Sequence, residues 1–275
     1  MKIAILDMYD NRPNEGMRCI QQLIRLVAGQ DSTDLTFDIF NVRAENHVPD
    51  LSYDLYISTG GPGIPMPLGE GWEGPFFALL DQLWNWNQTQ QQKKFVFLIC
   101  HSFQLAMGHW QLGDVSRRKS TSFGIFPIHK TDEGESDPLF GPLPNPFFGV
   151  DSRDYQVTLP ELDRMDTIGA TILCMEKIRP HVNLDRAIMA VRFSPEIVGT
   201  QFHPEADGDG MLRYFEKPDK REQVVSQHGE AKYDEMVAML QDPGTIELTE
   251  SMILPTFLRQ AILAYQVDNE LIERE

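Results

Sequence analysis

The feature that most constrains the fold is a set of short apolar segments spread along the chain. Each is four to six residues long and almost continuously apolar, and together they cover residues 3–6, 55–58, 95–99 and 188–193. Runs of this length and composition are typical of parallel strands that are covered on both faces. The chain therefore contains candidates for the central strands of a buried sheet.

Helical patterns alternate with these strand candidates. Between the first two segments, apolar residues recur at helical spacing: Met17, Ile20, Leu23, Ile24 and Val27. This stripe predicts an amphipathic helix with one buried face. A second helix is expected over residues 76–86 and a third just after Cys100. Strands that alternate with helices predict an α/β architecture, with an open, mostly parallel sheet flanked by helices.

Two later stretches differ in composition. Residues 121–160 are rich in Pro, Gly and Phe, which predicts loops and short antiparallel strands beside the main sheet. After Glu205 the pattern becomes helical, with apolar stripes on both sides of an Asp-Pro-Gly break at residues 242–244. We expect a main domain over residues 1–215 and a helical extension over 216–275 that packs on the same domain or on a partner subunit.

Charge and composition exclude several classes of partner. The 275 residues include 41 acidic and 24 basic side chains, for a formal net charge of −17. This balance argues against nucleic acid or an anionic membrane, since both require clustered Lys and Arg. Three widely spaced cysteines suit a reducing compartment. No metal-binding motif is present. No apolar run approaches the length of about 20 residues that a membrane-spanning helix needs. We expect a soluble, cytoplasmic protein without metal or cofactor.

Cys100 is the first candidate for chemistry. It follows the apolar segment 95–99 and precedes the helix expected to start near Ser102. In open α/β sheets, ligands bind at the carboxyl ends of the strands. A sharp strand-to-helix turn exposes a nucleophile there, and the helix N-terminus favours the thiolate. Taken alone, a cysteine at this position is more often a small buried hydrophobic residue than a nucleophile.

A second candidate is the segment Thr-Gln-Phe-His-Pro-Glu at residues 200–205. A nucleophilic thiol needs a base that takes its proton and later delivers it to the leaving group, and His203 provides one. Glu205 can accept the other imidazole N–H and fix the tautomer. Pro204 restricts the backbone between the two side chains. The alternative is an ordinary surface turn.

A third candidate is the Thr-Gly-Gly-Pro-Gly run at residues 59–63, which ends the strand segment 55–58. Glycines allow a tight turn that points a backbone N–H into a cleft, as an oxyanion hole requires. The run lacks the Lys-Ser or Lys-Thr of a phosphate-binding loop, which disfavours nucleotide binding.

Together, in this order and each after a strand, the three motifs resemble those of the class I glutamine amidotransferases. That family carries a glycine-rich turn, a nucleophile in the pattern C-x-G-x-Q, and then H-P-E about a hundred residues later. The matching stretches here are Gly60-Gly61-Pro62, Cys100-His101-Ser102-Phe103-Gln104 and His203-Pro204-Glu205. Residues 137–144 and 154–160 are also similar to the family, most of all to the amidotransferase domain of GMP synthase and its stand-alone relatives. The resemblance covers roughly residues 1–215 and implies a flavodoxin-like fold.

The resemblance implies a role for each matched residue. Cys100 would be the nucleophile, His203 the general base and acid, and Glu205 the carboxylate that orients His203. Gly61 and His101 would supply the N–H groups of the oxyanion hole. Gln104 and Asp154 would bind the substrate. The implied reaction is hydrolysis of the glutamine side-chain amide through a γ-glutamyl thioester, which releases ammonia and glutamate.

Two positions depart from the family pattern. Ser102 replaces the usual glycine of the turn after the nucleophile, where a side chain can strain the backbone. Ser152 stands where relatives often carry a histidine before the aspartate that Asp154 matches. The first departure bears on activity and the second on substrate recognition.

Several functions stay open at this point. The leading hypothesis is glutamine hydrolysis, with ammonia delivered to a GMP-synthase-like synthetase on another polypeptide, because no Ser-Gly-Gly-Val-Asp-Ser-type pyrophosphate loop is present. A second hypothesis keeps the same triad and hydrolyses γ-glutamyl peptides or related amides. A third is a catalytically silent relative that acts as an interaction protein. The apolar residues between 254 and 265 could pack within the chain or across a homodimer.

Overall fold

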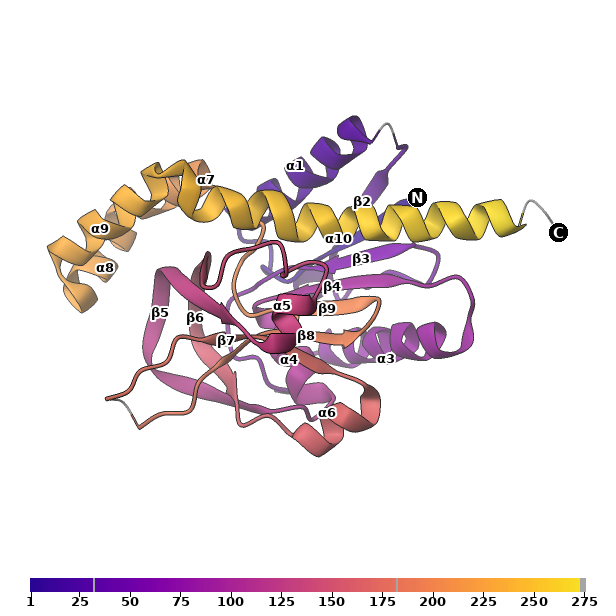
Figure 1. Ribbon diagram of the computed structural model, residues 1–275, viewed down its shortest axis with the longest axis horizontal. Coiled ribbons are helices and arrows are strands. Elements are labelled where there is room, and N and C mark those ends of the chain that lie inside the picture. The colour runs from indigo at the N-terminus through magenta and orange to yellow at the C-terminus, as the bar shows by residue number, and fades with distance from the viewer. Residues whose placement is uncertain (32, 182, 273–275) are drawn as a thin grey trace.

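A single curled sheet organises the molecule (Figure 1). The computed structural model describes residues 1–31, 33–181 and 183–272. Within these residues the sheet has nine strands in the order β2-β1-β3-β4-β9-β8-β7-β5-β6. The parallel half consists of β2 (Thr36–Asn41), β1 (Lys2–Asp7), β3 (Leu55–Ser58), β4 (Phe95–Ile99) and β9 (Ile197–Thr200). The antiparallel half consists of β8 (Ile188–Ser194), β7 (Thr171–Glu176), β5 (Asp114–Lys130) and β6 (Phe147–Thr158).

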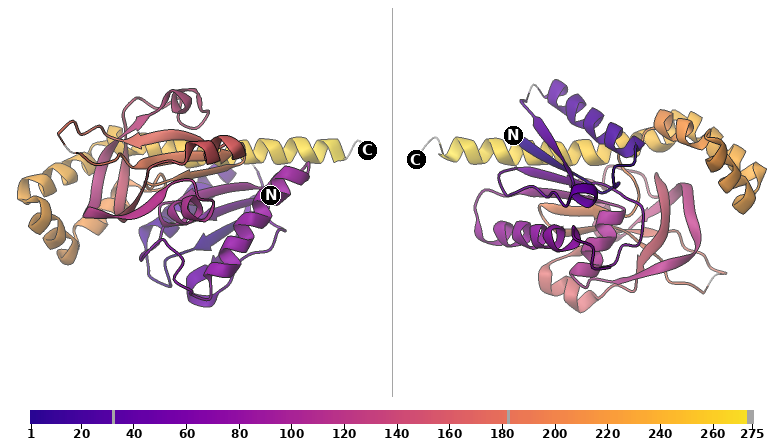
Figure 2. Two further views of the ribbon diagram at one scale, coloured as in Figure 1. Left: turned by 90° about the horizontal axis from the view of Figure 1, so that it is seen from below. Right: turned by 180° about the vertical axis from the view of Figure 1, so that it is seen from behind.

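Both faces of the parallel half are covered by helices, as the apolar runs predicted (Figure 2). Along β1, Ile3 and Ile5 belong to one apolar cluster while Ala4 and Leu6 belong to the other, because successive strand residues point to opposite faces. Helices α1 (Glu15–Gln30) and α10 (Pro243–Ile272) cover the first face. Helices α3 (Glu73–Thr89) and α4 (His101–His109) cover the second. The predicted α/β class, an open sheet flanked by helices, is confirmed.

The predicted helices form where the sequence placed them. Helix α1 buries the predicted stripe, and its N-terminus is capped by Asn14, whose side chain accepts a hydrogen bond from the Met17 N–H. Helices α3 and α4 correspond to the second and third predicted helices. Three short helices lie in the connections between strands: α2 (Val42–Glu45), α5 (Asp132–Ser136) and α6 (Leu162–Ile168).

Two strand predictions were wrong. The segment 188–193 forms β8, but it is antiparallel to its neighbours, and the parallel partner of β4 is the next strand, β9. Continuous burial on both faces is equally compatible with either direction, so the apolar pattern could not decide between them. Residues 121–160 hold the predicted antiparallel strands with a loop-rich connection between them, but the strands are long rather than short, since β5 has 17 residues and β6 has 12.

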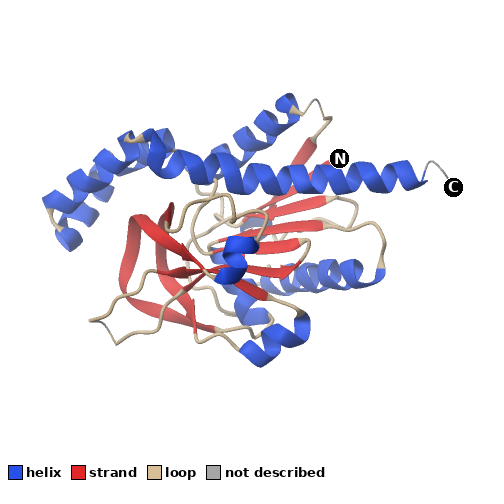
Figure 3. Ribbon diagram, in the orientation of Figure 1, coloured by secondary structure: helices blue, strands red, loops and turns tan. Residues whose placement is uncertain are grey.

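The C-terminal helices lie along one side of the sheet (Figure 3). They are α7 (Gly208–Phe215), α8 (Pro218–His228), α9 (Glu230–Gln241) and α10. In a third apolar cluster, Phe215 of α7 stacks on Phe123 of β5, and Met236 of α9 packs beside Gly124. Helices α7, α9 and α10 therefore bury apolar side chains on the sheet of the same chain, and α8 packs on α7 and α9. None of the described helices is long and apolar enough to cross a membrane.

Candidate active site

The candidate nucleophile occupies a strained turn. Cys100 links β4 to α4 with φ 49° and ψ −97°, a backbone conformation that costs a residue with a Cβ about 1–3 kcal/mol. The surrounding structure enforces it, because the Cys100 N–H donates to the Thr200 carbonyl of β9 at 2.7 Å. The turn places the Cys100 side chain, which is 4% exposed, at the carboxyl end of β4 and before the first turn of α4.

The predicted base and its carboxylate are adjacent to the cysteine. Strand β9 lies beside β4, so the loop that follows β9 reaches the same sheet edge as Cys100. The His203 N–H donates to the Val150 carbonyl of β6 at 2.8 Å. His203 Nδ1 and Glu205 Oε1 share a hydrogen bond of 2.8 Å, and the His203 ring and Cys100 Cβ both lie against Gly60. The structure therefore brings the three residues together.

Electrostatics in this group favour a charged imidazole. Burial by itself lowers the pKa of His203, but the Glu205 carboxylate and the Cys100 sulfur raise it, and the net pKa is well above the usual value. Glu205 is 1% exposed, and its Oε2 atom has no hydrogen-bond partner among the described residues. The arrangement favours a protonated His203 between Glu205 and Cys100.

The glycine turn after β3 lies against this group. A methyl group on Gly60 would lie 2.7 Å from His203 Cε1 and 3.6 Å from Cys100 Cβ. A methyl group on Gly61 would lie 2.4 Å from the carbonyl oxygen of Met8. Only glycine fits at either position, because both distances are shorter than a normal carbon contact. Gly60 packs on the candidate triad, and Gly61 packs on the end of β1.

Ser102 links the nucleophile turn to the glycine turn. Its hydroxyl is fully buried and donates to the Thr59 carbonyl at 2.6 Å. The Ser58 hydroxyl, 2.7 Å away, then donates to Ser102. Because the positive φ falls on Cys100 and not on Ser102, the serine side chain is accommodated without left-handed backbone at its own position. The departure from the family glycine creates two hydrogen bonds.

The remaining predicted residues have varied environments. The imidazole of His101 is buried, its Nε2 has no partner among the described residues, and burial together with Arg43 lowers its pKa to about 3. The Gln104 amide is also buried and donates to the Tyr155 carbonyl at 3.0 Å and to Gln201 Oε1 at 2.9 Å. Asp154 is exposed, and its carboxylate accepts a hydrogen bond from Thr121 at 2.5 Å.

Two further features were not predicted from the sequence. The Gln201 amide lies 3.7 Å from Cys100 Sγ, and the Ser152 carbonyl lies 3.9 Å from it. Within β6, the buried Arg153 guanidinium donates to Asp151 at 2.9 Å. The one sequence signal for Gln201 is its place in the same six-residue motif as His203, two residues before it. No sequence signal marked the Arg153–Asp151 pair. The described residues hold no group of three or more His, Cys, Asp or Glu side chains suited to a metal.

Comparison with known proteins identifies the fold. Neither a protein-family model nor a curated protein sequence matches the chain. Among solved structures, a glutamine amidotransferase from Thermotoga maritima is 15% identical with a TM-score of 0.64, over 95% of this chain and 98% of that chain. A glutamine amidotransferase from Methylobacillus flagellatus is 11% identical with a TM-score of 0.62, over 94% of each chain. The glutaminase domain of Trypanosoma brucei CTPS, with bound acivicin, is 15% identical with a TM-score of 0.55, over 74% of this chain and 86% of that chain. The chain has the fold of the class I glutamine amidotransferases.

Proposed function

We propose that this protein hydrolyses the side-chain amide of glutamine and releases ammonia and glutamate. The observation that carries the proposal is the convergence of Cys100, His203 and Glu205 at one sheet edge, on a fold that it shares with glutamine amidotransferases. The site carries the proposal, because a fold alone hosts many chemistries. We further propose that residues 1–215 form the amidotransferase-like domain and that 216–275 extend it.

The first half of the reaction forms a thioester. The Cys100 thiolate attacks the amide carbon of glutamine, and the negative charge that develops on the amide oxygen is stabilised by the N–H groups of Gly61 and His101. The His203 imidazolium then donates its proton to the amide nitrogen. The C–N bond breaks, ammonia leaves, and the γ-glutamyl group stays bonded to Cys100.

The second half of the reaction releases glutamate. His203, now neutral, accepts a proton from water, and the resulting hydroxide attacks the thioester carbonyl. The C–S bond breaks, glutamate departs, and Cys100 becomes a thiolate again beside the imidazolium. Glu205 keeps His203 in one orientation and tautomer through both halves, by the 2.8 Å bond to Nδ1.

We propose that the ammonia passes to a synthetase that lies outside these 275 residues. The sequence from 1 to 275 contains no Ser-Gly-Gly-Val-Asp-Ser-type pyrophosphate loop. The acceptor that such a synthetase activates is to be found by assaying ammonia transfer with candidate partners.

The proposed function is tested by ammonia release and by thiol labelling. Purified protein should release ammonia from glutamine, and acivicin, the compound bound in the trypanosomal structure, should label Cys100 near neutral pH. Cys100→Ala should abolish both, and His203→Ala should abolish ammonia release. Cys174→Ala is the matched control and should keep both, because Cys174 is a fully buried cysteine within an apolar cluster.

Each other outcome has a defined meaning. Hydrolysis of γ-glutamyl dipeptides without hydrolysis of glutamine would show that the same triad acts on γ-glutamyl peptides instead of glutamine. Absence of both hydrolysis and Cys100 labelling, with candidate partners added, would overturn the enzyme proposal in favour of an interaction protein.

The pH dependence of the reaction provides a prediction about Glu205. Its carboxylate raises the pKa of His203, so Glu205→Gln should let His203 lose its proton at lower pH. We expect the alkaline limb of the pH–rate profile to move to lower pH and kcat to fall about 100-fold or more. In the wild type, the stability that the imidazolium contributes is complete below pH of about 6.5 and is lost as the pH rises through the raised pKa. An alkaline limb that stays in place in the variant would contradict this assignment.

A further inference from the structure

Gln201 is held beside the candidate nucleophile by backbone hydrogen bonds on both sides. It follows β9 directly, and its side chain is fully buried. Its N–H donates to the Met189 carbonyl of β8 at 2.8 Å, and the carbonyl of the preceding Thr200 accepts the Cys100 N–H at 2.7 Å. The Thr200 hydroxyl donates to the Phe202 carbonyl at 3.0 Å. These bonds fix the backbone from which the Gln201 side chain extends.

A chain of hydrogen bonds fixes which end of the Gln201 amide faces Cys100. The chain begins at the Tyr155 carbonyl of β6, which can only accept, so the Gln104 atom 3.0 Å away is the amide nitrogen. The second N–H of that nitrogen donates to Gln201 at 2.9 Å, so the atom that receives it is Oε1. The other end of the Gln201 amide is therefore its nitrogen, which donates to Cys100 Sγ at 3.7 Å.

The Cys100 sulfur has two hydrogen-bond partners with opposite effects on its charge. The Ser152 carbonyl, 3.9 Å away, accepts the proton of the thiol and would repel a thiolate. The Gln201 amide donates to the sulfur, and such a bond is stronger when the acceptor carries a negative charge. Of the two contacts, the one with Gln201 favours a negatively charged sulfur.

We propose that Gln201 is a further catalytic residue, whose amide N–H stabilises negative charge on the Cys100 sulfur; this role rests on the function proposed above. The sulfur is charged at two stages, before it attacks the amide carbon of glutamine and after the C–S bond of the thioester breaks. In the thioester between these stages the sulfur is uncharged, and the same N–H stabilises it less. The amide therefore assists both the formation of the thiolate and its departure from the thioester carbonyl.

The experiment replaces Gln201 with Met in the full chain and measures how fast iodoacetamide alkylates Cys100 as a function of pH. Methionine has a similar length and no N–H donor. We expect the pH midpoint of alkylation to rise by about one unit, as for loss of one hydrogen bond to a charged group, and kcat for glutamine to fall about tenfold. His203 and Tyr9, the titratable side chains whose charges interact with that of Cys100, are unchanged in this variant. A structural role alone would lower the amount of folded protein and leave the midpoint in place.

The matched control is Asn87→Leu in α3. Asn87 is also buried, and its amide makes two hydrogen bonds, donating to the Lys94 carbonyl at 2.7 Å and accepting from the Lys94 N–H at 2.8 Å. Lys94 precedes β4, whereas Cys100 follows it. The control therefore removes a buried amide at the opposite end of the same strand and should leave the alkylation midpoint at the wild-type value.

A second variant protects the test against misfolding of the first. Gln201→Met combined with Gln104→Met removes donor and acceptor together, so neither amide is left buried with an unpaired group. The Tyr155 carbonyl keeps the bond that it accepts from Arg153 at 3.3 Å. The double variant should have the same alkylation midpoint as Gln201→Met, because Gln104 acts on the sulfur only through Gln201.

The fully buried Cys174 reports folding in the same samples, since it is alkylated only when the chain unfolds. An unchanged midpoint for Cys100 in both variants, with Cys174 unlabelled, would overturn the role of Gln201. So would a midpoint that rises only in samples in which Cys174 is labelled.

Alkylation also separates the two proposals, because it requires no turnover. If the wild type releases no ammonia but the midpoint rises as expected, the proposed function fails and the effect of Gln201 on the sulfur stands. If the wild type is active and the midpoint does not move, the Gln201 proposal fails alone.

Discussion

At the scale of single residues, the site is built from side chains and backbone that would be unfavourable elsewhere. Cys100 has left-handed backbone, Glu205 is a carboxylate with almost no exposure, and His101 is a buried imidazole without a partner for Nε2 among the described residues. Strain of this kind persists only where surrounding structure enforces it, and it gathers at functional sites. Here the enforcing contacts are short hydrogen bonds from neighbouring strands and turns, above all those of Ser102 and Thr200.

The Ser102 hydroxyl provides a prediction at this scale. Because Ser58 donates to Ser102 and Ser102 donates to the Thr59 carbonyl, the pair holds the glycine turn against the nucleophile turn. Ser102→Ala and Ser58→Ala should each lower kcat about tenfold, and the double variant should lose little more than either, since both remove the same link. The measurement is a double-mutant cycle on kcat. Losses that multiply in the double variant would show that the two hydroxyls act independently.

At the scale of elements, the site lies where four of them meet. Cys100 follows β4, and His203 and Glu205 lie in the segment after β9. The turn after β3 supplies Gly60, and β6 brings its Ser152 carbonyl near the Cys100 sulfur. The parallel neighbours β3, β4 and β9 end at the same edge, which is why their following loops converge. The antiparallel β6 joins them because the long β5–β6 ribbon folds back over this edge.

The glycine turn provides the prediction for this scale. Gly60→Ala would place a methyl group 2.7 Å from His203 Cε1, so the imidazole must move away from the sulfur. A displacement of about 1 Å at a reacting group lowers the rate on the order of 100-fold. The control is Gly29→Ala in α1, where a methyl group meets no atom within 4 Å; kcat should stay at the wild-type value. Equal activity in the two alanine variants would mean that the turn does not pack on the triad.

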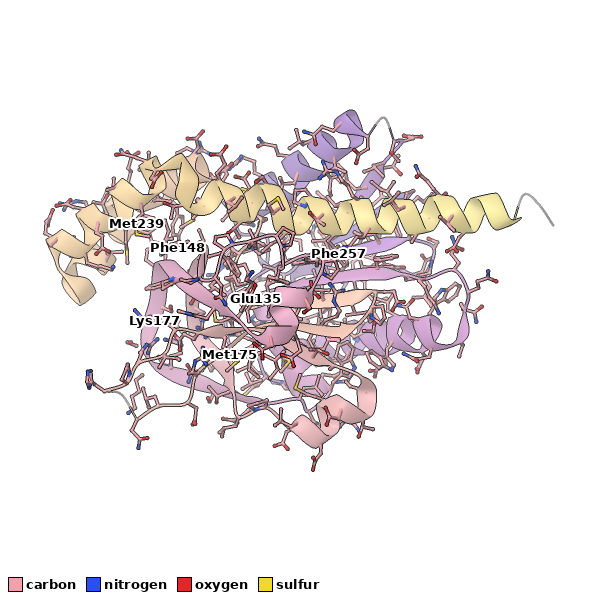
Figure 4. All side chains as sticks on the ribbon, in the orientation of Figure 1. Glu135, Phe148, Met175, Lys177, Met239 and Phe257 are labelled. Atoms are coloured by element: carbon pink, nitrogen blue, oxygen red, sulfur yellow. The ribbon has the colours of Figure 1, made fainter. Side chains whose placement is uncertain are left out.

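At the scale of the whole molecule, the C-terminal helix completes the core of the sheet. Phe257 of α10 is labelled in Figure 4 on the side of the helix that faces the strands. It is fully buried, with its ring centroid 5.1 Å from that of Phe97 in β4 and 5.9 Å from that of Phe95. The helix therefore seals the face of the strand that carries Cys100 at its end, and residues beyond 215 contribute to the stability of the part that holds the site.

Phe257 provides the prediction for this scale. Phe257→Ala should lower the free energy of unfolding by about 3–5 kcal/mol, because it leaves a cavity between α10 and β4. Leu263→Ala on the same helix removes a side chain that is 61% exposed and should change stability by less than about 0.5 kcal/mol. Urea denaturation of both variants gives the comparison. A loss in Phe257→Ala as small as that in Leu263→Ala would mean that α10 is not part of the cooperative core.

The sequence by itself determined the local elements and the class of fold. The stripe of α1, the apolar runs of β1, β3 and β4, and the helix after Cys100 follow from periodicity, which depends on nearby residues alone. It also predicted that Cys100 and the glycine turn follow strands, but it placed His203 after the segment 188–193, whereas the strand that precedes His203 is β9. Only the tertiary structure decided that β8 runs antiparallel and that β9 lies between β8 and β4. It also decided that the Gln104 amide is bonded to Tyr155 and Gln201. An apolar pattern reports how deeply a segment is buried, whereas strand direction, neighbours and hydrogen-bond partners depend on contacts between residues far apart in the chain, which no local pattern encodes.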